Sequence, residues 1–176
     1  NYFRKSVLDP ITRQNTTDNT PAVIHYEIVP GDGLKLSIMA KGFGSENMGR
    51  LFMLVPSDGM EGIKKAVVQT VIDAGGKPCP PIILGVGIGG TMEKAALLSK
   101  KALFRELESH NKDTGLDKLE KEMLSEINAL GIGAQGFGGK VTAMGVFVET
   151  FPTHIAALPV AVSVQCHCSR HKEIVL

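Results

Sequence analysis

The sequence lacks a long apolar segment and a concentration of charge of one sign. No apolar run approaches the roughly 20 residues of a membrane-spanning helix, and no charged leader precedes an apolar segment and a cleavage site. The formal net charge is +1 and lysine and arginine form no cluster, which excludes a polyanion such as nucleic acid as the partner. These absences predict a cytoplasmic protein that binds neither membranes nor nucleic acid.

Cysteine is also scarce, with three residues in the chain. The number is odd, and Cys166 and Cys168 are too close in sequence to suggest a structural bridge. A disulfide framework is therefore excluded. Metal binding and inert burial remain as roles for the thiols.

The length and the glycine distribution describe what is present. A chain of 176 residues, 43% of them hydrophobic, predicts a single domain over residues 1–176 with a real core. The 20 glycines are unusual because they are bunched, at 42–44, 75–76, 85–90 and 131–139. Such bunching predicts loops with a functional role.

Hydrophobic periodicity predicts the order of the elements. The expected elements are a helix end over 2–8, a loop over 11–21, a hairpin of 22–29 and 34–40, a loop over 41–47, strands at 51–55 and 81–86, helices at 58–75, 91–104 and 116–130, and apolar segments at 141–148 and 156–164. Asp58 and Glu61 have the form of a capping box, and Thr91 is a candidate cap. Because strands and helices alternate after Leu51, the fold class is α/β to α+β, with a mixed, mostly buried β-sheet and helices packed on it.

The segment Gly85–Gly90 satisfies the pattern GxGxxG between a predicted strand and a predicted helix. A dinucleotide site would need an acidic residue at the tip of a second parallel strand, whereas Glu106 and Glu108 fall at the end of a helix. A weaker reading is that backbone N–H groups at the helix start attract an anion. The structural alternative is that these glycines let a helix approach the sheet closely.

The cysteine segments have the composition of metal-ligand segments. Cys79 lies between Pro78 and Pro80, which fix the backbone on both sides. Cys166 and Cys168 are two residues apart, so on a strand they would face the same side while His167 faces away. With His171 they suggest zinc, although the CxxC spacing is missing, and an iron–sulfur cluster fits the thiolates better.

His154 stands just ahead of the apolar run that reaches Cys166. A lone histidine before a strand is usually a loop residue that forms hydrogen bonds. Its place one element away from a predicted ligand favours a catalytic acid/base or substrate-contact role.

Several motifs together resemble one known family. NTTDNTPAVIHYEIVPGD, KGFGSENMGRL, GGKPCPPIILGVGIGGTMEKAA, GIGAQGFGGK and VQCHCSRH, which span nearly all of the chain, are similar to the class I iron–sulfur fumarases and the L-tartrate dehydratases, specifically the C-terminal portion of the α subunit or α-like domain. Under this resemblance the GxGxxG pattern is a coincidence. The chain starts at Asn1 with residues typical of an interior segment, so we expect a portion to precede it.

The resemblance implies a 4Fe–4S cluster held by three cysteines, with one iron open to substrate. It assigns Cys79 and Cys166 as ligands and expects the third in a Cys-Gln-Asp-Thr-Gly motif upstream of this chain. It places Arg4 and Gly44 in substrate binding and His154 in the pocket. The catalytic base would belong to a β subunit or β-like domain, with which the protein would form an oligomer.

The implied activity is reversible addition or removal of water on a small dicarboxylate, either fumarate/malate or tartrate/oxaloacetate. Two departures from the family pattern are Phe43, where a glycine is expected, and Cys168, where a cysteine is unusual. The second leaves Cys166 and Cys168 as alternative ligands. The alternative function is a non-catalytic nucleotide- or anion-binding module that uses the glycine-rich loops.

Overall fold

A computed structural model describes residues 5–20 and 22–176. The chain divides into two compact units, Asn1–Leu34 and Lys35–Leu176. The predicted substrate residue Arg4 lies outside the described residues.

The described part of the first unit is built of turns. Val7 forms an isolated antiparallel bridge with Asn15, and the Asp9 carboxylate accepts hydrogen bonds of 2.7 Å from the N–H groups of Ile11 and Thr12. The helix end predicted up to Leu8 is wrong for residues 5–8, because the N–H of Ser6 donates to the side chain of Asn19 at 2.8 Å and that of Leu8 to the carbonyl of Gln14 at 2.6 Å. The loop predicted from residue 11 is confirmed as far as residue 20.

The predicted hairpin is also wrong. Residues 22–29 form no strand, and Val23 and Ile28 are 87% and 98% exposed. The second arm is a strand, β1 (Lys35–Ala40), but it pairs antiparallel with β6 (Arg170–Val175), from Lys35 opposite Val175 to Ala40 opposite Arg170. Local alternation indicated the strand correctly and could not reveal its distant partner.

The centre of the second unit is a four-stranded sheet in the order β2-β5-β3-β4. Its strands are β2 (Arg50–Leu54), β3 (Ile82–Gly89), β4 (Ala143–Phe151) and β5 (Leu158–Gln165). β3 runs parallel to β4 and antiparallel to β5, which in turn runs antiparallel to β2. All eight residues of β3 are buried, so the predicted mixed and mostly buried sheet is confirmed.

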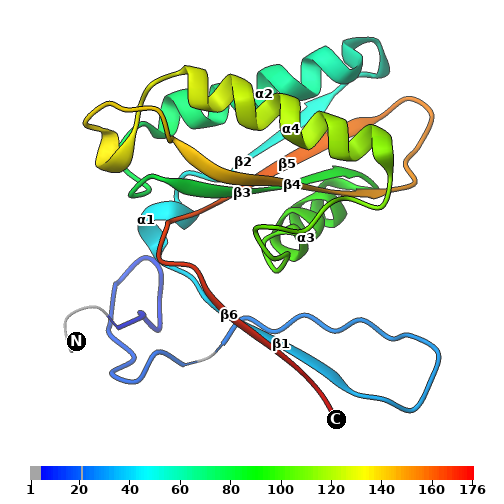
Figure 1. Ribbon diagram of the computed structural model, residues 1–176. Helices are drawn as coiled ribbons and strands as arrows, with labels where there is room; N and C mark the ends of the chain where they lie inside the picture. The colour runs from blue at the N-terminus through cyan, green and yellow to red at the C-terminus, as the bar shows by residue number, and fades with distance from the viewer. Residues whose placement is uncertain (1–4, 21) are drawn as a thin grey trace. The chain divides into compact units, whose positions relative to one another are not determined.

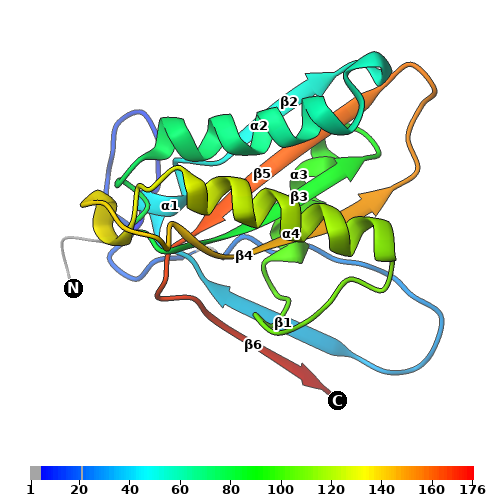
Figure 2. The same ribbon diagram turned by 45° about the horizontal axis from the view of Figure 1, so that its top comes forward.

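Helices cover both faces of this sheet (Figures 1 and 2). The long helices α2 (Gly59–Ala74) and α4 (Thr114–Ala129) lie side by side on one face, and α3 (Met92–Ala102) lies on the other. The shorter helical segments are α1 (Phe43–Glu46) and the 3-10 turns η2 (Pro56–Asp58) and η3 (Ala134–Gly136). The helices predicted at 58–75, 91–104 and 116–130 are confirmed, with α1 added inside the segment predicted as a loop.

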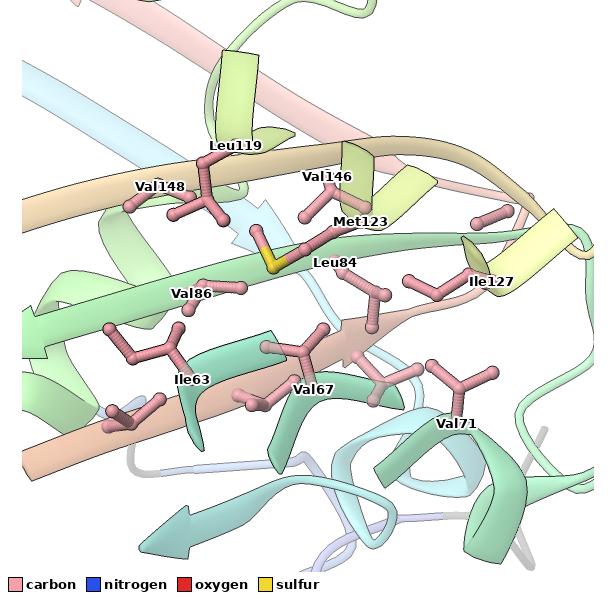
Figure 3. Close-up of a cluster of buried hydrophobic side chains, with 14 of the residues drawn as sticks. Ile63, Val67, Val71, Leu84, Val86, Leu119, Met123, Ile127, Val146 and Val148 are labelled. Carbon is pink, nitrogen blue, oxygen red and sulfur yellow. The ribbon is translucent and has the colours of Figure 1, made fainter. Parts of the chain in front are cut away.

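The main core lies between the sheet and the pair α2 and α4. Figure 3 shows Ile63, Val67 and Val71 of α2 facing the same strand residues as Leu119, Met123 and Ile127 of α4. Alternate residues of β3, such as Leu84 and Val86, point into this layer, as a strand requires. Burial of this apolar surface, at about 25 cal/mol per Å², is the main force that holds the helices on the sheet.

The helix ends differ in detail from the sequence prediction. The Asp58 carboxylate does not cap α2, because it accepts the N–H of Val55 at 3.0 Å and closes the preceding 3-10 turn. Thr91 stands at the N-cap of α3, but its hydroxyl donates to Glu93 at 2.6 Å rather than accepting a backbone N–H. Gly75, with φ of +53°, ends α2 as predicted, because glycine enters this region at little cost.

Candidate functional site

The segment that carries Cys79 connects α2 to β3 and is held on two sides. The Cys79 N–H donates to the carbonyl of Gly76 at 3.2 Å, and Cys79 has a φ of +59°. The carbonyl of Pro80 accepts both the backbone N–H of Gln135, at 2.8 Å, and its side-chain amide, at 3.2 Å. A non-glycine residue in the left-handed region costs of order 1–3 kcal/mol and persists only where its surroundings fix it. Cys79 is exposed, so its thiol is available for binding.

The second glycine loop, residues 131–139, packs against this segment. A Cβ on Gly76 would lie 2.8 Å from the carbonyl oxygen of Gln135, and one on Gly136 would lie 2.7 Å from the Cα of Gly76. Gly136 also has a φ of +81°. This loop therefore supports the Cys79 segment through close backbone contact.

Cys166 follows directly on the last residue of β5, and the chain bends there before β6. The bend turns the ring of His167 toward the other cysteine segment, where its Nδ1 lies 3.0 Å from the carbonyl oxygen of Cys79. The structure thus brings the segments of Cys79 and Cys166 together at one edge of the sheet. Cys166 is half-buried, whereas Cys168 is exposed.

Gly44 belongs to the same edge through α1. A Cβ on Gly44 would lie 3.5 Å from the carbonyl oxygen of Lys77, two residues before Cys79. Glu46, two residues further along α1, forms ion pairs with Lys41, at 2.9 Å, and with Lys100. The Lys41 ammonium also donates to the carbonyl of Val164 at 2.6 Å. α1 and the end of β5 are therefore joined by charged hydrogen bonds.

The electrostatics of this network follow from its partial burial. Burial lowers the pKa of Lys41 below its ordinary value, although Glu46 and, as the smallest contribution, Cys166 act to raise it. Burial by itself would raise the pKa of Glu46, but hydrogen bonds from Lys100 and Lys41 outweigh it and hold that pKa below its ordinary value. Cys166 therefore lies within electrostatic reach of an ammonium group.

His154 lies at the opposite edge of the sheet. Its neighbour Thr153 donates to the carbonyl of Gly90 at 2.8 Å, just beyond the carboxyl end of β3, whereas Cys79 precedes the start of that strand. The eight residues of β5 separate His154 from Cys166, a span of roughly 25 Å at 3.3 Å per residue. The structure does not bring His154 together with the two cysteines of its own chain.

The GxGxxG segment is not a ligand loop. Gly85 and Gly87 lie inside β3, and a Cβ on either would approach within 2.0 Å of a backbone carbonyl of α3, that of Ser99 or Ala95. The prediction of a functional loop at 85–90 is therefore wrong, and the structural alternative is confirmed. Gly90 at its end is also engaged, because its N–H donates to the carbonyl of Pro152 at 3.2 Å.

The zinc alternative is also not supported. His171 lies in β6, its ring packs edge-on against Phe104, and its Nε2 is 3.7 Å from Glu106. Across residues 5–20 and 22–176, no group of three or more His, Cys, Asp or Glu residues is placed to hold a metal ion. The described residues therefore do not assemble a zinc site of their own.

Sequence reasoning missed three residues of this edge: Lys41, Glu46 and His167. A strand over residues 166–168 would turn His167 away from the cysteine side chains, but the chain bends after Gln165 and the ring of His167 contacts the Cys79 segment. The charge alternation in KGFGSEN was the available signal for Lys41 and Glu46. It was insufficient because Val164, whose carbonyl accepts a hydrogen bond from Lys41, lies 123 residues away in sequence.

Comparison with known proteins identifies the family. The family model of fumarate hydratase (fumerase) matches residues 1–175. The chain belongs to the fumarate hydratase family.

None of the helices in the described part of the chain has the length and apolar character of a membrane span.

Curated relatives in this family are α subunits of L(+)-tartrate dehydratases. The chain is 48% identical over 173 residues, 96% of its length, to a protein predicted to be this subunit in Methanocaldococcus jannaschii. It is 37% and 36% identical over 160 residues, 90% of its length, to the L(+)-tartrate dehydratase subunits alpha of Escherichia coli strains UTI89 and K12. The chain spans 61% of the first relative and 52% of the other two.

Proposed function

We propose that this chain is the cluster-bearing portion of the α component of an iron–sulfur hydro-lyase. The enzyme would reversibly add or remove water on a small dicarboxylate, either fumarate/malate or tartrate/oxaloacetate. Family membership supports the reaction class, and the names of the relatives support an α component that works with a β component. The observation that carries the proposal is the 3.0 Å contact between His167 and Cys79, which holds the two cysteine segments at one edge.

Cys79 and Cys166 would hold the 4Fe–4S cluster, with the third cysteine supplied from outside this chain. Their thiolates have the donor chemistry that such clusters require, and both are accessible at the same edge. The bound cluster would supply a Lewis-acidic iron that polarises the hydroxyl and carboxylate of the substrate. We assign Cys166 rather than Cys168 because Cys166 is fixed by β5 and lies within reach of the Lys41 charge.

The chain's own residues would bind and orient the substrate. Gly44 would offer its backbone to a substrate carboxylate at the edge of the two cysteines, where its Cβ position lies 3.5 Å from the carbonyl oxygen of Lys77. Arg4 would bind a carboxylate through its forked donors. We propose that the catalytic base lies in the β component.

His154 keeps its proposed acid/base or substrate-contact role, but its position in the fold limits where it could act. Because it stands at the far end of β5, it would reach a cysteine edge only in the site of a second copy of the chain. This condition supports an oligomeric enzyme. A His154→Asn variant should lower kcat while the cluster content stays unchanged.

The test is anaerobic reconstitution of the complete α protein with iron and sulfide, followed by assay with its β component. We expect absorption and electron paramagnetic resonance signals of an iron–sulfur cluster, together with hydration of fumarate or dehydration of tartrate. Cys79→Ala should abolish both signals. Full activity in Cys79→Ala, or no cluster signal in the unaltered protein, would refute the proposal.

A further inference from the structure

Lys41 lies where three elements of the second unit meet. It follows β1, its ammonium donates to the carbonyl of Val164 near the end of β5, and it pairs with Glu46 at the end of α1. Glu46 also receives the Lys100 ammonium from α3. One side chain thus connects the β1–α1 turn, β5 and, through Glu46, the helix on that face of the sheet.

The hydrogen bonds of Lys41 exclude direct contact with a substrate. A lysine ammonium has three N–H donors, and that of Lys41 has three acceptors: Val164 O at 2.6 Å, Glu46 Oε2 at 2.9 Å and Ser45 Oγ at 3.3 Å. Its side chain is 13% exposed. With every donor engaged and little surface open, Lys41 acts on the protein rather than on a ligand.

Two of the residues that bind the Lys41 ammonium, Val164 and Glu46, are each two residues in sequence from a proposed functional residue. Val164 precedes Cys166 by two residues, and Glu46 follows Gly44 by two residues. Fixing Val164 and Glu46 on one ammonium therefore fixes the position of Gly44 relative to Cys166. Charged hydrogen bonds in a partly buried site are stronger and more directional than neutral ones.

We propose that Lys41 is a positioning residue that sets the spacing between the Gly44 turn and the Cys166 thiol, with Glu46 and Lys100 holding it in place. The inference rests on the proposed function for its chemical meaning. Lys41 would keep the ligand segment and the substrate-binding backbone in register. Partners that orient metal ligands in this way typically change metal affinity or activity by 10–100-fold when removed.

The experiment compares Lys41→Met, Lys41→Arg and Glu46→Gln in the complete α protein. Lys41→Met keeps the length of the side chain and removes its charge and its donors. Lys112→Met is the matched control, because Lys112 is exposed just ahead of α4. Each protein is reconstituted anaerobically, and iron and sulfide content, the electron paramagnetic resonance spectrum and the rate of cluster loss in air are measured. KM and kcat are then determined after addition of the β component.

We expect Lys41→Met to lose its cluster about 10-fold faster than the unaltered protein and to show an altered resonance spectrum. KM should rise more than kcat falls, because the Gly44 turn moves relative to the cluster. Lys41→Arg should restore part of the cluster lifetime and part of the KM. Glu46→Gln should show the same changes as Lys41→Met, but more weakly. Amide hydrogen exchange of residues 42–49 should accelerate in cluster-free Lys41→Met, which reports on the turn independently of the metal.

Two results separate the possible failures. If the unaltered protein takes up no cluster, the proposed function fails, while the exchange measurement on cluster-free protein still tests the positioning by Lys41. If the unaltered protein takes up a cluster and Lys41→Met changes only its melting temperature, with spectrum, KM and cluster lifetime like those of Lys112→Met, the positioning role is overturned. Should Lys41→Met fail to fold, Glu46→Gln and Lys100→Met decide the same question.

Discussion

The Nδ1 atom of His167 lies 3.0 Å from the carbonyl oxygen of Cys79, although 88 residues separate them in sequence. In this contact Nδ1–H donates and the carbonyl accepts. The contact joins the two segments that carry the proposed cluster ligands. If the cluster binds there, His167 would act as a partner that orients one ligand segment relative to the other.

Removal of this contact should weaken cluster binding. In His167→Ala we expect the iron and sulfide retained after anaerobic reconstitution and gel filtration to fall about 10-fold. The melting temperature should change little because His167 is exposed. His110→Ala, which removes an exposed histidine paired with Asp117 on α4, is the control and should retain its cluster. Equal retention in both variants would contradict a role for His167.

The choice between the neighbouring cysteines is open to a direct comparison. Cys166→Ser should lose the cluster, whereas Cys168→Ser should retain both cluster and activity, because only Cys166 is held by β5. Absorption spectroscopy of the two reconstituted proteins makes the measurement. The opposite pattern would move the ligand to Cys168.

Gly87 should not accept a side chain. A Cβ there would lie 2.0 Å from the carbonyl oxygen of Ala95 and 2.6 Å from the amide nitrogen of Ser99, both backbone atoms of α3. Gly87→Ala should therefore lower the free energy of unfolding by about 3 kcal/mol or more, the upper end for overpacking. Gly42→Ala is the control, since Gly42 has a φ of −76° and no atom near its Cβ position. Denaturant titration distinguishes the two.

Glu120 should be essential to the stability of α4 on the sheet. Its carboxylate is 5% exposed and accepts hydrogen bonds from the Arg105 guanidinium at 2.6 Å, from Asn111 at 2.9 Å and from the N–H of Val148 at 2.8 Å. Glu120→Ala leaves these donors unpaired and should lower the free energy of unfolding by about 3–5 kcal/mol. Glu126→Ala, at an exposed position of the same helix, should change it by less than about 0.5 kcal/mol.

The pKa of Glu46 predicts a pH dependence. Burial acts to raise it, but hydrogen bonds from Lys100 and Lys41 hold it below the ordinary value of 4.5. A carboxylate with a lowered folded pKa stabilises the fold fully above its unfolded pKa and loses that contribution as pH falls through the folded value. The stability difference between the unaltered protein and Glu46→Gln should therefore shrink as pH falls below about 4.5. A difference in melting temperature that stays constant across this range would contradict the network.

The sequence determined the elements of the central layer because their signals are local. The apolar stripe of α2, the amphipathic pattern of α4 and the β-branched run of β3 follow periodicities that neighbouring residues impose. The family resemblance assigns Cys79 and Cys166 as a pair of soft ligands, and this assignment stays a prediction. A local pattern does not specify the distant segment with which a strand pairs. The alternation in residues 34–40 therefore predicts a hairpin with residues 22–29, whereas this strand, β1, pairs with β6.

Only the tertiary structure decided which of these residues meet. It brought Cys79 to His167 across 88 residues and Lys41 to Val164 across 123, because the antiparallel course of β5 beside β3 returns the chain to the edge where β3 begins. The same course carried His154 to the opposite edge, although it lies only 12 residues from Cys166 in sequence. It also showed that the GxGxxG segment has no room for a ligand at Gly85 and Gly87, because the backbone of α3 packs against these two glycines.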